Sequence, residues 1–173
     1  MIVPIVLYGA PVLRQSAFDI HQEDLPDEIA GNLFDTLKRA EGIGLAAPQI
    51  GLTKRIFVMD TTPLVEENVQ FKPVEKVYLN PRVLHSDNEL STFNEGCLSI
   101  PGIFRELERP ERIHVTYQNL AFETIEEELS GLEARIFQHE YDHLDGILFI
   151  DWLSGLQKRL IQGKLNKIKK KRR

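Results

Sequence analysis

His139 and His143 are the residues whose spacing most clearly suggests chemistry, because they enclose a glutamate in the run His139-Glu140-Tyr141-Asp142-His143. On an α-helix, residues four positions apart lie on one face, so both imidazoles can point at a single metal ion. Glu140 is rotated by about 100° from His139 and can reach a water molecule instead. The H-E-x-x-H pattern is typical of metal-dependent hydrolases in which the glutamate acts as general base.

Short patterns of this kind also occur by chance, and the alternative is a surface helix with two solvated histidines. Leu132, Ile136, His139 and His143 recur at i, i+4, i+7 and i+11, so the histidines continue a core-facing apolar stripe. Two buried imidazoles one turn apart need polar partners, and one metal ion supplies a partner for both. The context therefore favours a metal site.

Cys97 is the main candidate for a third ligand, since a catalytic metal needs about three protein ligands and one open position. This single cysteine lies in Glu95–Gly102 (EGCLSIPG), where the glycines and the Pro-Gly turn allow close approach of the backbone. A thiolate with two imidazoles suits zinc or ferrous iron. A lone cysteine is also often a buried small hydrophobe. His21, His85 and His114 are rival third ligands.

The segment Gly42–Gln49 (GIGLAAPQ) is the third region of interest. A phosphate-binding loop is disfavoured, because no Gly-Lys-Ser/Thr follows and the glycine spacing does not match a dinucleotide fingerprint. Taken alone, the segment favours a helix terminator with a turn. Alternatively, Gly42 and Gly44 let backbone groups pair with a peptide substrate, and Gln49 places a neutral amide near the metal.

The elements that must position these residues form an α+β pattern. An amphipathic helix is predicted over Asp27–Glu41, ended by Gly42, with Ile29, Leu33, Phe34 and Leu37 on one face. The spacing and composition predict strands at Lys54–Asp60, Val74–Leu79 (stopped by Asn80-Pro81), Arg112–Gln118 and Phe122–Leu129. We expect short, mostly antiparallel strands packed around a central HExxH-bearing helix, with a C-terminal helix.

The central helix is predicted from Ser130 to about Asp145. Ser130 and Glu133 have capping-box spacing, and Gly146 is a natural residue to follow the helix end. A third helix is predicted from near Asp151 into the tail, with an apolar stripe of Leu153, Leu156, Leu160 and Ile161.

The length of 173 residues suits one domain, 1–173, with a basic helix or tail at about 152–173. The net charge of −5 is unevenly distributed: Lys158–Arg173 carries nine basic and no acidic residues. This tail is either solvated or in contact with RNA phosphates. No apolar run approaches a membrane span, and no signal peptide is apparent, so we expect a cytoplasmic protein with no membrane contact. The lack of a heptad seam favours a monomer.

The three motifs together resemble those of the peptide deformylase family. The family motifs GxGLAAxQ, EGCLS and HExDH are matched by Gly42–Gln49, Glu95–Ser99 and His139–His143, in that order. The resemblance covers most of residues 1 to about 150. It implies an α+β fold and metal-dependent removal of the formyl group from N-formylmethionyl nascent peptides, which releases formate and a free N-terminal methionine.

The resemblance also implies roles for individual residues. Cys97, His139 and His143 would hold one divalent metal, natively Fe²⁺, which Zn²⁺, Ni²⁺ or Co²⁺ can replace. Glu140 would be the catalytic acid and base, and Gln49 and the Leu98 N–H would bind the developing oxyanion. The substrate-binding residues would be Ile43, Gly44, Phe93, Glu95, Gly96, Leu132, Arg135 and Ile136. Arg135 departs from an apolar lining, and we expect its stem to lean on the pocket with its charge in water.

Two other functions remain as alternatives. A metallopeptidase shares H-E-x-x-H but usually takes a further histidine or glutamate as third ligand. A binding protein would use the basic tail, with the metal site structural or inactive; in the resembled family the C-terminal helix is associated with ribosome binding. Arg109 and Glu41 flank the site segments and form either a charge pair or separate surface groups.

Overall fold

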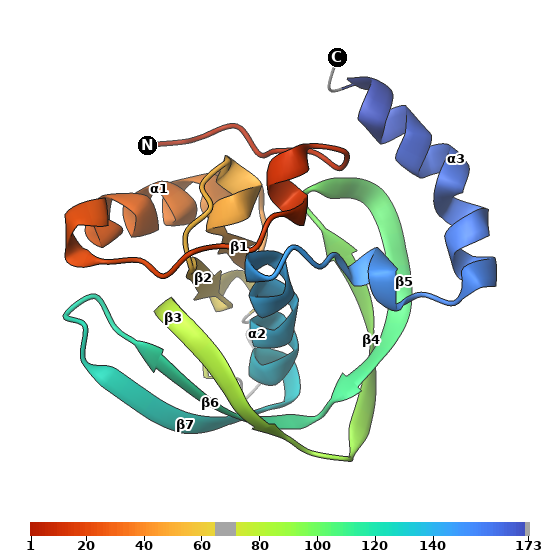
Figure 1. The fold of residues 1–173 in the computed structure, drawn as a ribbon. Helices are drawn as coiled ribbons and strands as arrows, with labels where there is room; N and C mark the ends of the chain where they lie inside the picture. The colour runs from red at the N-terminus through yellow and green to blue at the C-terminus, as the bar shows by residue number, and fades with distance from the viewer. Residues whose placement is uncertain (65–71, 172–173) are drawn as a thin grey trace.

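The computed structural model describes residues 1–64 and 72–171, which form three α-helices and seven strands (Figure 1). The helices are α1 (Pro26–Arg39), α2 (Gly131–Leu144) and α3 (Gly155–Lys171). The strands are β1 (Gly44–Ala46), β2 (Ile56–Asp60), β3 (Glu75–Ser86), β4 (Leu90–Cys97), β5 (Ile100–Pro110), β6 (Arg112–Gln118) and β7 (Thr124–Ser130). None of the helices in these residues is long and apolar enough to cross a membrane.

The strands form two antiparallel sheets, one of five strands in the order β1-β2-β3-β6-β7 and one hairpin of β4 and β5. The prediction of β6 is confirmed, and those of β2 and β7 are confirmed to within two residues. The predicted end of β3 at Asn80 is wrong. The chain instead passes through a register shift between Leu79 and Arg82, where Asn80 has a φ of 49°, and pairing with β6 resumes. A local irregularity of this kind bends a strand without ending it.

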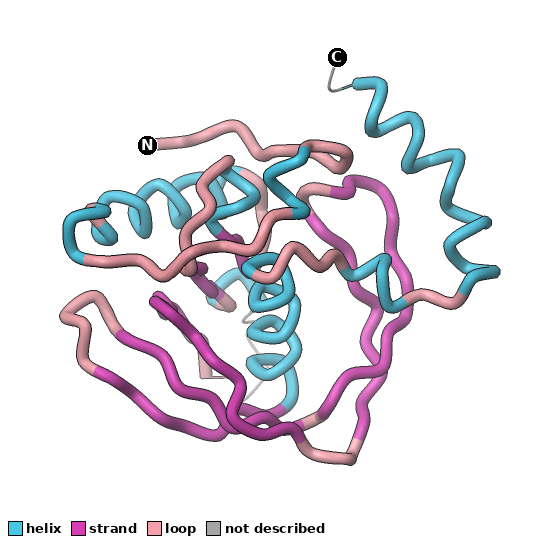
Figure 2. The backbone as a smooth tube through the Cα atoms, in the orientation of Figure 1, coloured by secondary structure: helices cyan, strands magenta, loops and turns pink. Residues whose placement is uncertain are grey.

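Helix α2 lies between the two sheets, as Figures 1 and 2 show. Phe137 packs edge-on against Phe57 and Tyr78 of the five-stranded sheet, with ring centroids 5.2 Å apart in each pair. This geometry stabilises aromatic pairs beyond simple burial. The aromatic contacts fix one face of α2 on the sheet and leave another face toward the hairpin. The expected α+β fold around a central HExxH helix is confirmed.

The ends of α2 were only partly predicted. Gly146 follows the helix with a φ of 73°, as expected for a residue in the left-handed region. The predicted capping box is wrong, because the Ser130 side chain forms no cap hydrogen bond. Ser130 is instead the last residue of β7 and pairs with Arg112, so its extended backbone belongs to the sheet.

Helix α1 begins at Pro26 and ends at Arg39, two residues before the predicted end. Leu33 and Leu37 are buried against β1 and β2, as the apolar periodicity predicted. The segment after it is more than a turn, because Gly44–Ala46 forms β1 and Ala47–Ile50 forms a 3₁₀ helix.

Helix α3 starts later than predicted, because a short 3₁₀ helix, Phe149–Trp152, comes first. The predicted stripe is half wrong: Leu153 and Ile161 are buried, but Leu156 and Leu160 are exposed. The buried face is made by Ile161, Leu165 and Ile168, which pack in one cluster with residues of β5. Leu160 directly precedes Ile161, so the two side chains are about 100° apart around the helix and only one of them can face the core.

Candidate metal centre and active site

Cys97, His139 and His143 converge at the junction of the hairpin and α2. Their ligand atoms all lie within 4.8 Å of one another, and Cys97 Sγ is 3.3 Å from His143 Nε2. His139 Nδ1 is 2.9 Å from Glu95 Oε1, which leaves Nε2 of that ring for the centre. The rival histidines belong to no such cluster within residues 1–64 and 72–171, and His114 pairs with Glu126 instead.

This donor set fits a divalent metal ion. Bonds of about 2.0 to 2.3 Å in a tetrahedral site place two ligand atoms about 3.5 Å apart, close to the sulfur–nitrogen separation seen here. One thiolate and two imidazoles suit zinc and ferrous iron. The carboxylate on Nδ1 of His139 fixes its tautomer, as is usual for histidine ligands.

The two histidines have opposite electrostatic surroundings. Burial lowers the pKa of both, but in His139 hydrogen bonds to Cys97 and Glu95 outweigh burial and hold the pKa well above its usual value. For His143, burial and the neighbouring His139 act together, and its pKa falls well below the usual value. Without metal, the surroundings of His139 therefore favour its charged form, and those of His143 favour its neutral form.

Glu95 is the centre of a buried charge network behind His139. It accepts hydrogen bonds from Arg109 at 2.8 and 3.1 Å and from Arg135 at 2.7 Å. Burial alone raises the pKa of Glu95, but the hydrogen bonds from His139 and Arg109 lower it well below its usual range. Arg109 also donates to Asp142 of α2. Arg109 is thus paired with Glu95 and Asp142 rather than with Glu41.

The prediction that Arg135 keeps its charge in water is wrong. Its side chain is 5% exposed, pairs with Glu95 and donates to the carbonyls of Ser91 and Leu107. The guanidinium lies over the Phe93 ring at 4.9 Å. A buried arginine is tolerable because a carboxylate and two carbonyls satisfy its donors.

Glu140, the second buried glutamate of the site, has none of the hydrogen-bond donors that surround Glu95. Its side chain is buried beside β1, and its Oε2 has no hydrogen-bond partner within the described residues. A Cβ added at Gly44 would lie 2.5 Å from Glu140 Oε1 and 2.9 Å from Ile136, so only glycine leaves room for the carboxylate. Burial raises the pKa of Glu140 to about 7. Such a group can accept and return a proton near neutral pH.

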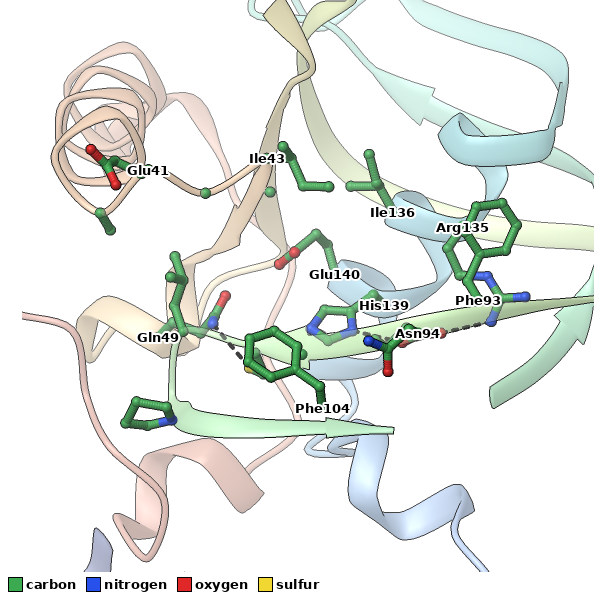
Figure 3. Close-up of a pocket in the computed structure, with 18 of the residues that line it drawn as sticks. Glu41, Ile43, Gln49, Phe93, Asn94, Phe104, Arg135, Ile136, His139 and Glu140 are labelled. Carbon is green, nitrogen blue, oxygen red and sulfur yellow. Dashed lines mark hydrogen bonds and ion pairs between the residues drawn. The ribbon is translucent and has the colours of Figure 1, made fainter. Parts of the chain in front are cut away.

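Gln49 approaches the centre from the 3₁₀ helix after β1. Its Oε1 accepts a hydrogen bond from the Ala46 N–H, which orients the amide so that Nε2 lies 3.6 Å from Cys97 Sγ and 3.3 Å from Ser99 Oγ (Figure 3). Gln49 therefore offers a fixed donor beside the sulfur. Leu98 follows Cys97 directly at the turn of the hairpin.

A cavity of about 570 Å³ opens onto this centre (Figure 3). Every predicted substrate-binding residue lines it: Ile43, Gly44, Phe93, Glu95, Gly96, Leu132, Arg135 and Ile136. Gln49, Cys97, Leu98, His139 and Glu140 line it as well. Glu41 and Pro101, which lie in or beside the segments singled out in the sequence, line it too, whereas Asn94 and Phe104 were missed. The β4–β5 pairing could have revealed Asn94 and Phe104, because it places both on one face of the hairpin.

A buried glutamate beside a Cys-His-His centre at the end of a cavity defines a metal-dependent hydrolase. The model of the polypeptide deformylase family matches residues 2–159. A peptide deformylase of Cytophaga hutchinsonii is 42% identical over 171 residues, covering 98% of this chain and 92% of that protein. One of Christiangramia forsetii is 44% identical over 179 residues, covering 98% and 91%.

Solved structures agree. Peptide deformylase 1B of Arabidopsis thaliana, crystallised with an inhibitor, aligns with a TM-score of 0.86 at 36% identity, over 98% of this chain and 91% of that one. The Thermotoga maritima peptide deformylase gives 0.77 at 44% identity, over 89% and 99%. The chain belongs to the polypeptide deformylase family. It is a metalloenzyme that removes the N-formyl group from nascent peptides.

Proposed function

We propose that Cys97, His139 and His143 hold one divalent metal, natively Fe²⁺, which Zn²⁺, Ni²⁺ or Co²⁺ can replace, and that Glu140 handles the proton of the reaction. The observation that carries this proposal is the convergence of the three ligand atoms next to a buried, unpartnered carboxylate. When bound, the metal supplies Lewis-acid chemistry, which polarises a carbonyl and lowers the pKa of water.

Glu140, Gln49 and Leu98 have separate roles in the proposed reaction. Glu140 accepts a proton from the attacking water and returns it to the amine that leaves, so it acts first as base and then as acid. The Gln49 amide and the Leu98 N–H donate hydrogen bonds to the formyl oxygen as negative charge develops. A pre-positioned donor of this type is worth about 10²–10³ in rate. Formate and a peptide with a free α-amine result.

The cavity supports a peptide substrate with an N-terminal methionine. Ile43 and Ile136 form an apolar wall beside Glu140 in Figure 3, and Leu132 lines the same cavity, which suits the methionine side chain. Among the strands that the structure describes, β1 and β4 are each paired on one side only, so their free edges can hydrogen-bond an extended peptide. The missing side chains at Gly44 and Gly96 leave room for Glu140 and for the Phe104 ring, which keeps both groups close to these edges. We expect selectivity for formyl over acetyl to be steric, because the formyl carbon carries only hydrogen.

The direct test is formate release from formyl-Met-Ala-Ser by protein loaded anaerobically with Fe²⁺ or Ni²⁺. Release is expected, while acetyl-Met-Ala-Ser stays intact. Unformylated peptides with internal bonds serve as the control for a metallopeptidase, which would cut them. Elemental analysis of anaerobically purified protein identifies the metal. Absence of formate release from fully loaded protein would overturn the proposal.

We also propose that the enzyme acts as a cytoplasmic monomer, with residues 1–173 as one domain, and that α3 contacts the ribosome. Ile161, Leu165 and Ile168 hold α3 on the body, which leaves its lysines exposed. Clustered basic groups bind RNA phosphates with strong salt dependence. Changing Lys164, Lys167 and Lys170 together to glutamine should weaken ribosome sedimentation at low salt and leave peptide activity intact. Unchanged sedimentation would contradict the ribosome contact.

A further inference from the structure

Arg55 is a buried arginine that the proposed reaction does not use. It directly precedes β2 and is 7% exposed. Its backbone is fixed on both sides, because its N–H donates to the Phe18 carbonyl at 2.8 Å and its carbonyl accepts from the Asn80 N–H at 2.9 Å. The side chain crosses to the C-terminal end of α2, where it donates to Asp145 Oδ1 at 2.6 Å. Arg55 therefore ties the five-stranded sheet to the helix that carries the two histidines.

The contacts of Arg55 lie on the side of α2 that faces away from the metal ligands. The guanidinium is 5.3 Å from the centroid of the Tyr141 ring. Tyr141 and Asp145 are four positions apart, so they share one side of the helix. At about 100° per residue, Tyr141 is about 160° from His143 around the helix axis. The metal centre and Arg55 therefore hold the last turn of α2 from opposite sides.

The burial of Arg55 suits a role in alignment better than a role in stability. Its Nε has no hydrogen-bond partner within the described residues, and its Nη2 reaches the Pro81 carbonyl only at 3.4 Å. A desolvated charge pair adds little net stability, but it can fix the register of the elements that it joins. Lys76 and Glu133, at the first turn of α2, are 3.9 Å apart, so the closer of these two ion pairs between helix and sheet is the one beside His143.

We propose that Arg55 is a positioning residue, which sets the alignment of His143 and Glu140 with the rest of the site. It acts through Asp145 and Tyr141. The inference rests on the roles proposed above for the metal ligands and for the glutamate. Arg55 and its two partners do not line the described cavity, so the effect passes through α2 and involves no contact with substrate.

The position of Glu140 depends directly on how α2 lies against β1. Glu140 Oε2 has no hydrogen-bond partner within the described residues, and a Cβ at Gly44 of β1 would overlap the carboxylate. β1 pairs with β2, which Arg55 precedes, and the 3₁₀ helix after β1 carries Gln49. A displaced last turn of α2 would therefore move Glu140 and His143 relative to Gln49. A misplacement of about 1 Å can lower a rate by about 10²-fold.

The first experiment measures kcat and KM for formyl-Met-Ala-Ser with metal-loaded protein. Arg55→Gln and Asp145→Ala each remove the ion pair, and we expect kcat to fall about tenfold while KM stays within about twofold of the wild-type value. Arg55→Lys keeps a charge that can reach Asp145 and should return kcat to within about threefold of wild type. The double variant Arg55→Gln/Asp145→Ala should lose no more than either single variant. Unchanged kcat in both single variants would overturn the inference.

A second readout separates alignment from lost stability. The visible absorption of Co²⁺-loaded protein reports the ligand geometry around the ion, so its d–d bands should change in Arg55→Gln and in Asp145→Ala. Leu33→Val is the control for stability alone, since Leu33 is buried between α1 and the sheet. It should lower the midpoint of urea unfolding and leave the spectrum and kcat at their wild-type values. Identical spectra for wild type and both ion-pair variants would contradict the alignment role.

The results also separate this inference from the proposed function. If metal-loaded wild type releases no formate, the proposed function itself fails. If the wild type is active and the folded, metal-loaded Arg55→Gln and Asp145→Ala variants are equally active, only the positioning role is wrong. Arg82→Gln, which breaks a 2.6 Å pair with Asp19, is the matched control for the loss of an arginine and should equal the wild type in kcat and spectrum. An equal loss of kcat in this control would also overturn the inference.

Discussion

Two buried glutamates next to His139 behave in opposite ways. Glu95 is 6% exposed and Glu140 is 4% exposed, so their burial is nearly equal. Glu95 is surrounded by Arg109, Arg135 and His139, and the hydrogen bonds from His139 and Arg109 hold its pKa low, whereas burial raises the pKa of Glu140 to about 7. The comparison teaches that hydrogen-bond donors decide the charge of a buried carboxylate: Glu95 stays charged and orients the His139 ring, whereas Glu140 is suited to the proton exchange proposed for it.

The largest effect on activity is expected from Glu140→Gln, which tests whether Glu140 is the carboxylate that exchanges protons. Glutamine fills the same space but cannot accept a proton from water, so formate release should fall by about 10²–10⁴. Metal content by elemental analysis should match the wild type, because Glu140 is not a ligand in the proposed site. Retention of more than a tenth of the wild-type rate would remove Glu140 from the mechanism.

Glu95→Gln should mainly lower the stability of the fold and the affinity for metal, because Glu95 does not take part in the proposed proton transfer. Removing one carboxylate leaves Arg135 buried without a counter-charge and costs about 3–5 kcal/mol of the free energy of unfolding. Metal affinity should fall about 10- to 100-fold, since His139 loses the charged carboxylate acceptor on Nδ1 and keeps at most a neutral amide oxygen there. Urea unfolding and competition with a chelator measure the two effects. Glu126→Gln, which breaks an exposed pair with His114, is the control and should change both far less.

The two glutamates should also give opposite pH dependence in metal-free protein. The pKa of Glu140 is higher in the folded protein than in the unfolded chain. Its contribution to the free energy of unfolding is therefore fully present below the ordinary pKa of 4.5 and is lost as the pH rises through about 7. Between pH 5 and 8, the free energy of unfolding of the wild type should therefore fall by up to about 3 kcal/mol relative to that of Glu140→Gln. The pKa of Glu95 is lowered, so its contribution disappears as pH falls below 4.5. Parallel unfolding curves for wild type and Glu140→Gln across pH 5 to 8 would contradict the raised pKa.

The smallest effect is expected at the edge of the Glu95 network. Trp152 Nε1 donates to Asp142 Oδ2 at 2.9 Å, but Trp152 is 59% exposed. Trp152→Phe removes that bond while Arg109 still holds Asp142, so the free energy of unfolding should fall by about 1 kcal/mol or less. Formate release should not change. A large loss of activity would show that the network extends to this edge.

The motif-bearing helix could be predicted from the sequence because its signals are local. The 3.6-residue spacing of Ile136, His139 and His143 and the left-handed Gly146 depend only on neighbouring residues. The glycine-rich turn around Cys97 favoured it as the third ligand but left three histidines open as rivals, and the resemblance then implied Cys97. Its roles, like those of Gln49 and Leu98, remain predictions.

The hairpin and its charges could not be predicted in the same way. β4 contains the buried Glu95 between exposed Asn94 and the glycine at 96, so its hydrophobic alternation is weak. The burial of Arg135 depends on Glu95, 40 residues away, and on carbonyls of β4 and β5. These partners are brought to Arg135 only by the tertiary fold. The general expectation that an arginine keeps its charge in water therefore could not predict its burial.

Cys97 and His143 are 46 positions apart and come from different secondary structures. A growing chain therefore has no complete binding centre until α2, near its C-terminal end, has docked on the hairpin. Contacts between distant segments form late because loop closure must precede them. Tight metal uptake should accordingly be among the last events of maturation, and a chain that ends before α2 would not bind the metal tightly.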